Sequence, residues 1–230
     1  MSTVMHSPDK WLSFGLAYVG GFGDAAGFVL AKTFPGHITG SLVLGAIATA
    51  AHDWHGTLAH LTATACFLTG IPVSAVIARL TVTRSCWPFL PLGIEVILIT
   101  AAYFVLAFGC TPGREIFVVC MSLALGLQNG AFRRTGGISV HTNYLTGMIT
   151  GLLAAETESH ALPTVPHFSI AADPKTGLLY GVWGTFVLGA VTGAAIVLRF
   201  RERGILAIVL VLFGLMARDL AVPRPADSAS

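Results

Sequence analysis

Eight apolar runs, separated by short polar breaks, follow one another along the 230-residue chain. Six of them are close to or above the ~20 residues that a helix needs to cross a bilayer. These are residues 11–31, 57–80, 87–110, 115–132, 177–198 and 204–220. Residues 38–51 and 143–155 are short for a full crossing. The pattern predicts an all-α polytopic integral membrane protein with six full spans plus two short apolar segments, and so six to eight transmembrane helices.

The composition agrees with this class. Charged residues make up 10% of the chain, hydrophobic residues 54%, and the mean hydropathy is +0.78. A soluble domain carries roughly a quarter charged residues, so we expect no soluble catalytic domain and no enzymatic activity. The formal charge of +2 is too small to indicate nucleic-acid binding. The expected partners are the lipid bilayer and a small solute, without a cofactor, and a homo-oligomer is left open.

Residues 20–45 are echoed by residues 125–151. In each stretch a Gly-rich apolar run carries a polar residue, passes through a basic loop, reaches a His and enters a second apolar run at Thr-Gly. The matched positions are Asp24 with Gln128 and Asn129, Lys32 with Arg133 and Arg134, His37 with His141, and Thr39-Gly40 with Thr146-Gly147. The Thr111-Pro112-Gly113 boundary separates the copies. We therefore predict two repeated membrane halves, residues 1–112 and 113–230, as is common in carriers.

The positions of the thirteen Lys and Arg residues leave the topology open. If all eight runs cross, the repeat is parallel and both termini are outside, because the loops that are richer in Lys and Arg face the cytoplasm. If the two short runs are re-entrant and do not cross the membrane, six spans remain and the halves are inverted. Each arrangement divides the basic residues eight against five. Basic loops at equivalent places in both halves favour the parallel version.

Two signatures in the repeat are more specific than the hydrophobic pattern. They are the Asp24 segment followed by Thr39-Gly40, and Gly126-Leu127-Gln128-Asn129 followed by His141-Thr142 and Thr146-Gly147. Together they resemble the YoaK family of bacterial membrane proteins, domain of unknown function 1275, over roughly residues 12–220. That family usually has Thr-Gly-Asn in its first half, whereas the third residue here is Ser41. The resemblance implies a multi-pass protein of the bacterial inner membrane, and no particular substrate or reaction.

Acidic and amide side chains inside the apolar runs are the first candidates for function. An ionisable side chain at mid-span costs about 2.5 to 3.5 kcal/mol on insertion scales and is retained mainly where it faces a cavity or a partner. Asp24 is therefore predicted to couple transport to protons or cations, with a structural, hydrogen-bonded acid as the alternative. Glu95 is a weaker candidate of the same kind. Gln128 and Asn129 are placed to face Asp24 across the pseudo-symmetry axis, or to bond neighbouring helices.

The short Thr-Gly runs add candidates for a solute or ion pathway. A broken helix exposes N–H groups and a dipole end, so paired short segments in two halves point to a transport site. The candidates are Thr39, Gly40, Ser41, Thr146 and Gly147, with His141 beside them. Close helix packing through small residues is the alternative for the glycines.

A metal site is a weaker hypothesis. His52, His55 and His60 lie near Asp53, and Glu156, Glu158 and His160 follow the second short run. These residue types can ligate a divalent ion, but no strict HxxxH or ExxH pair is present, so we predict no metal. Cys66, Cys86, Cys110 and Cys120 have no paired spacing and are interpreted as packing residues.

These observations favour a small-solute transporter coupled to protons through Asp24. The alternatives are a structural or partner-binding membrane subunit and, less favoured, an intramembrane metal-dependent enzyme. The solute, the coupling ion and the direction of transport are not determined by the sequence.

Overall fold

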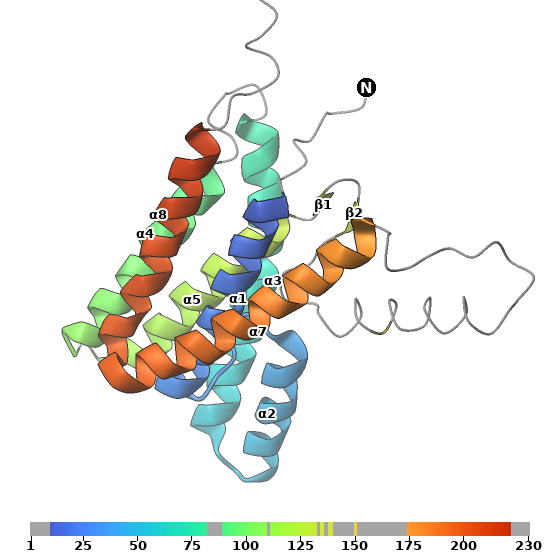
Figure 1. Cartoon of the computed structure of the whole chain (residues 1–230). Coiled ribbons are helices and arrows are strands. Elements are labelled where there is room, and N and C mark those ends of the chain that lie inside the picture. Colours follow the sequence, from blue (N-terminus) through green and yellow to red (C-terminus); the bar gives the residue numbers. More distant parts are fainter. Residues whose placement is uncertain are drawn as a thin grey trace, which may run out of the picture.

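The computed structural model describes residues 10–81, 89–109, 111–132, 134–135, 138–139, 150 and 174–221. Within these residues the chain is almost entirely helical (Figure 1). The helices are α1 (Lys10–Ala31), α2 (Ile38–Ala50), α3 (Trp54–Thr81), α4 (Phe89–Ala107), α5 (Gly113–Ala131), α7 (Pro174–Phe200), the 3-10 turn η2 (Arg201–Ile205) and α8 (Leu206–Ala221). Two short antiparallel strands, β1 (Arg134–Thr135) and β2 (Ile138–Ser139), follow α5.

The helices coincide with the apolar runs to within a few residues at each end. The short run 38–51 forms α2, whereas the run 143–155 lies outside the described residues except for Thr150. Four described stretches are long and apolar enough to cross a membrane: Lys10–Ala31, Trp54–Ile77, Leu90–Ala107 and Gly177–Arg218. The last has 42 residues and continues through α7, η2 and α8.

Large apolar side chains cover much of the outer surface. Ile97 on α4, Leu188 on α7 and Leu210 on α8 are all more than half exposed. Such a surface is solvated well by lipid tails and poorly by water. The chain is therefore an α-helical protein with the features of a membrane protein.

Helix α5 is not among the stretches that are apolar enough to cross a membrane. Its position among other helices explains why. It packs against α3, α4 and α1, and most of its residues from Phe117 to Asn129 are buried. A helix surrounded by other helices does not need a lipid-compatible surface, so it can carry Gln128 and Asn129.

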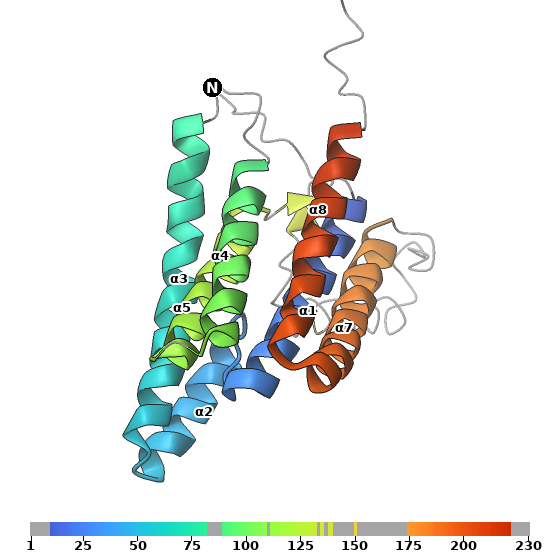
Figure 2. The ribbon, with the colours of Figure 1, turned by 90° about the vertical axis from the view of Figure 1, so that its left-hand side faces the viewer.

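The described helices form two groups (Figures 1 and 2). In the first group α3 and α4 pack on α5, and α2 packs on α3. In the second group α7 packs along α1, and α8 lies beside α1 and α4. The Thr192 hydroxyl on α7 donates to the Tyr18 hydroxyl on α1 at 2.8 Å.

Glycines set the close crossings within each group. A Cβ at Gly126 would lie against the backbone carbonyl of Phe67, and Gly70 is in contact with Gly126 in return. A Cβ at Gly21 would lie against the carbonyl of Phe186 in the same way. Both crossings therefore bring helix backbones together at a distance that only small residues allow.

The order of contacts gives the helix directions. Along α3 and α5, residues 67 to 74 meet residues 126 to 130 in rising order, so these helices are parallel. Helices α1 and α7 are parallel for the same reason. Helices α1 and α5 are antiparallel, because Gln128 reaches Leu16 while Leu125 lies near Gly23. Figure 1 shows α1 running downward and α5 upward.

Candidate functional site

Asp24 lies on α1 and is 5% exposed. Its Oδ1 atom accepts a hydrogen bond from the backbone N–H of Gly36 at 2.6 Å. Its Oδ2 atom is buried and makes no hydrogen bond to a described residue. The imidazole Nδ1 of His37 lies 4.0 Å from this Oδ2, and the His37 side chain is 39% exposed. The carboxyl therefore has one oxygen that is held by a hydrogen bond, and a second oxygen that is able to bind a proton or an ion.

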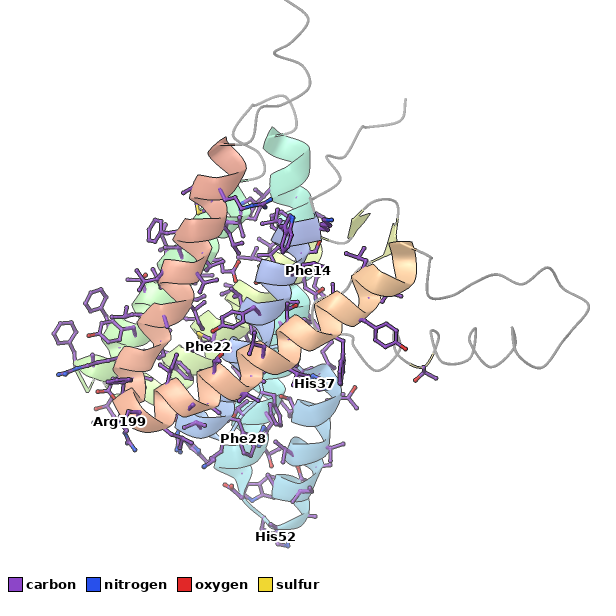
Figure 3. The ribbon with its side chains drawn as sticks, in the orientation of Figure 1. Phe14, Phe22, Phe28, His37, His52 and Arg199 are labelled. Atoms are coloured by element: carbon purple, nitrogen blue, oxygen red, sulfur yellow. The ribbon has the colours of Figure 1, made fainter. Side chains whose placement is uncertain are left out.

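The segment between α1 and α2 turns back against α1 to bring Gly36 to Asp24. Gly27 leaves room for the Pro35 ring, which a Cβ at that position would overlap. The rings of Phe28 and Phe34 stack with their centroids 4.8 Å apart. Figure 3 shows Phe28 near the lower end of α1, with His37 at the start of α2. The return segment is thus held by aromatic packing as well as by the Asp24 carboxyl.

The first turn of α2 joins the same site. The buried Ser41 hydroxyl donates to the carbonyl of Phe34 at 2.7 Å, and Gly40 lies against the rings of Phe34 and His37. Thr39, in contrast, is exposed. No side chain caps α2, so its N-terminal dipole end adds a positive potential near the Asp24 carboxyl.

The Gln128 amide contacts α1 at a distance from Asp24. The Gln128 side-chain amide donates to the carbonyl of Leu16 at 2.9 Å, and Leu16 precedes Asp24 by about two helical turns, or ~12 Å along the axis. The expectation that the Gln128 amide faces Asp24 is therefore wrong, whereas for Asn129 it stays a prediction. Asn129 is buried, and neither polar atom of its side chain has a hydrogen-bond partner among the described residues.

Glu95 is on α4, away from the return segment. It is completely buried, and its two carboxyl oxygens have no hydrogen-bond partner in the described part of the chain. The structure does not link it to the Asp24 site.

Comparison with known families identifies the chain. The model of the family described as protein of unknown function (DUF1275) matches residues 12–217. The chain belongs to this family. Comparisons with curated proteins and with solved structures found no match. The match includes Asp24 and the α2 entry, where the DUF1275 chain described here has Ser41 bonded to Phe34.

The histidines of the metal hypothesis are dispersed among different environments. His52 follows the end of α2, as Figure 3 shows, and His60 is buried on α3. His55 Nε2 lies 2.7 Å from Glu115 Oε1 on α5. The described residues contain no group of three or more His, Cys, Asp or Glu side chains placed to hold a metal ion. His160 lies outside these residues.

The pairing of His55 with Glu115 was missed by the sequence analysis. The residues are far apart in sequence and lie at the first turns of two different helices. Only the packing of α3 on α5 brings them together. His141, Thr146 and Gly147, the candidates in the second short segment, lie outside the described residues.

Proposed function

We propose that this protein is a carrier of a small solute in the bacterial inner membrane, built from two inverted halves and coupled to protons through Asp24. The observation that carries the proposal is a buried carboxyl held at the entrance to a short helix. Discontinuous helices of this kind, with a polar group at the break, are typical of transport sites.

Reciprocal helix crossings support the two halves. Gly126 and Asn129 follow Gly21 and Asp24 by the same number of residues. Gly126 meets the carbonyl of Phe67, and Gly21 meets the carbonyl of Phe186. Phe67 and Phe186 also match in sequence, because Phe67-Leu68-Thr69-Gly70 lines up with Phe186-Val187-Leu188-Gly189. The packing of α3 on α5 therefore corresponds to the packing of α7 on α1, which is expected if residues 1–112 and 113–230 share one fold.

Opposed helix directions favour an inverted repeat over the parallel repeat suggested by the basic loops. Matched helices α1 and α5 are antiparallel by their contacts. In Figure 1, α3 rises where α7 descends, and α4 descends where α8 rises. Six full spans with two short segments satisfy this arrangement, and the second short segment would be the equivalent of α2.

The inverted arrangement also assigns the two faces. The side that holds Lys10, the end of α3 and the start of α7 would carry eight of the thirteen basic residues. The other side would carry Lys32, Arg114, Arg199, Arg201 and Arg203. The positive-inside rule places the richer side, with both termini, in the cytoplasm.

The geometry at Asp24 suggests how a proton could alter the conformation. An ionised carboxylate strengthens the hydrogen bond from Gly36, because charge-assisted bonds are roughly twice as strong as neutral ones. Protonation at Oδ2 would weaken that bond and release the return segment together with the start of α2. His37 is half-exposed and close to Oδ2, so it offers a route by which a proton can reach the buried acid.

The test uses the full-length protein in liposomes that contain a pH-sensitive dye. Amino acids, sugars, organic acids and nucleobases are added in turn, with solute uptake and internal pH recorded together. A carrier coupled to protons gives a solute-dependent pH change that is lost in Asp24→Asn. Absence of uptake for every class, with a correctly folded protein, would contradict the carrier and favour a partner-binding membrane subunit.

A further inference from the structure

Glu95 lies within the most tightly packed face of α4. Leu92, Glu95, Ile99 and Ala102 are spaced by three or four residues and so share one face of the helix. All four are at most 2% exposed. The three apolar members belong to the central cluster that also contains Phe117 of α5 and Leu212 of α8. An acid therefore occupies a position that the pattern reserves for apolar side chains.

The described residues around Glu95 offer no compensation for a negative charge. Both carboxyl oxygens are buried without a hydrogen-bond partner among the described residues. The elements packed on α4 are α5, α8 and η2. Their charged side chains for which the structure describes the burial are at helix ends and are exposed or half-exposed: Arg114 and Glu115 on α5, Arg201, Glu202 and Arg203 on η2, and Arg218 on α8. An isolated carboxylate in such surroundings is strongly disfavoured relative to the neutral acid.

A bound metal cation fits this position poorly. Hard cations in proteins need several oxygen ligands around them. The described residues provide no group of three or more His, Cys, Asp or Glu side chains around Glu95 or elsewhere. A proton needs only one oxygen, and it removes the charge that the site cannot accommodate.

We propose that Glu95 is a second proton-binding site, in the group formed by α3, α4 and α5, whereas Asp24 is in the group formed by α1, α7 and α8. Glu95 holds its proton as a neutral acid in the resting protein and exchanges it when the helices around α4 move. The binding of the proton does not depend on the carrier hypothesis. Its use in transport rests on that proposed function.

Infrared difference spectroscopy of the full chain in lipid tests this site. Glu95→Gln keeps the shape of the side chain and removes the carboxyl group. At neutral pH, the wild-type spectrum minus the Glu95→Gln spectrum should contain one carbonyl band of a protonated carboxylic acid. In D2O this band should shift as the acid proton is replaced by deuterium. Glu95→Asp, which retains an acid, should restore a displaced band.

Two results would overturn the proposal. The first is a carboxylate signal in place of the acid band at neutral pH. The second is an acid band that never shifts in D2O, since that describes a sealed structural acid. If Glu95→Gln does not fold, the same decision rests on Glu95→Asp and on wild-type protein labelled with 13C in its Glu carboxyl groups. An acid band that shifts in D2O, without any solute-dependent flux, would support the Glu95 proton site and contradict only the carrier function.

Discussion

Gly36 donates its backbone N–H to Oδ1 of Asp24 at 2.6 Å, across twelve positions of sequence. This contact joins the middle of α1 to the entrance of α2 and leaves Oδ2 without a hydrogen bond to a described residue. One side chain thus combines a structural role, through Oδ1, with an oxygen that can take up a proton. Substitutions can separate the two roles because an amide also accepts a hydrogen bond.

Asp24→Ala should destabilise the protein more than Asp24→Asn, because the neutral amide keeps a weaker bond from Gly36. The alanine variant loses the bond that fixes the return segment, and a hydrogen bond of this kind contributes about 1 to 3 kcal/mol. The amide oxygen of the asparagine variant can still accept from Gly36. Thermal unfolding in detergent measures the difference. Equal losses of stability in both variants would show that charge, rather than the Gly36 bond, fixes the segment.

Ser41→Ala should lower the free energy of unfolding by about 0.5 to 1.5 kcal/mol, because the bond to the Phe34 carbonyl is lost. The matched control is Thr69→Ala. The Thr69 hydroxyl donates to the carbonyl of Ala65 within α3 and is exposed. Chemical unfolding of both variants provides the comparison. A larger effect at Thr69 than at Ser41 would contradict the assigned role of Ser41 in holding the return segment.

Two glycines on α7 should respond oppositely to alanine. A Cβ at Gly189 would press on the backbone of Tyr18, whereas a Cβ at Gly184 would meet nothing within 4 Å. Overpacking against backbone costs about 1 to 3 kcal/mol, and alanine at an open helical position gains about 0.5 to 1 kcal/mol. Chemical unfolding of Gly189→Ala and Gly184→Ala measures both changes in stability. If Gly189→Ala is as stable as the wild type, the α1–α7 crossing is not as close as described.

Single-cysteine labelling should locate the ends of the helices. In a background without native cysteines, Ala51→Cys and Phe108→Cys should react from outside intact cells with a membrane-impermeant maleimide. Trp11→Cys should react only after the cells are opened, because the inverted arrangement places the start of α1 in the cytoplasm. Labelling of all three positions from the outside would contradict that topology.

The sequence predicted the helices and their class because lipid and core contacts both require long apolar runs, which composition reveals directly. It also selected Asp24, since an acid within such a run is costly. It could not give Gly36 as the partner of Asp24, because that contact depends on how the Pro35 turn folds back.

The predicted partnership of Asp24 with Gln128 failed for a different reason. Sequence matching predicts that two positions are equivalent but does not predict whether their helices are parallel or antiparallel. The bond from Gln128 to Leu16, together with the contact of Leu125 near Gly23, shows that α5 is antiparallel to α1. The His55–Glu115 pair was missed in the same way, since only tertiary packing of α3 on α5 brings these residues together.

Proton-coupled uptake by wild-type and Asp24→Asn protein, compared in liposomes with equal amounts of folded protein, tests the central claim most directly. A solute that enters with a change of internal pH through the wild type should produce neither uptake nor pH change through Asp24→Asn, although the variant is folded. Undiminished uptake and proton movement through Asp24→Asn would contradict the claim and leave Asp24 as a structural acid.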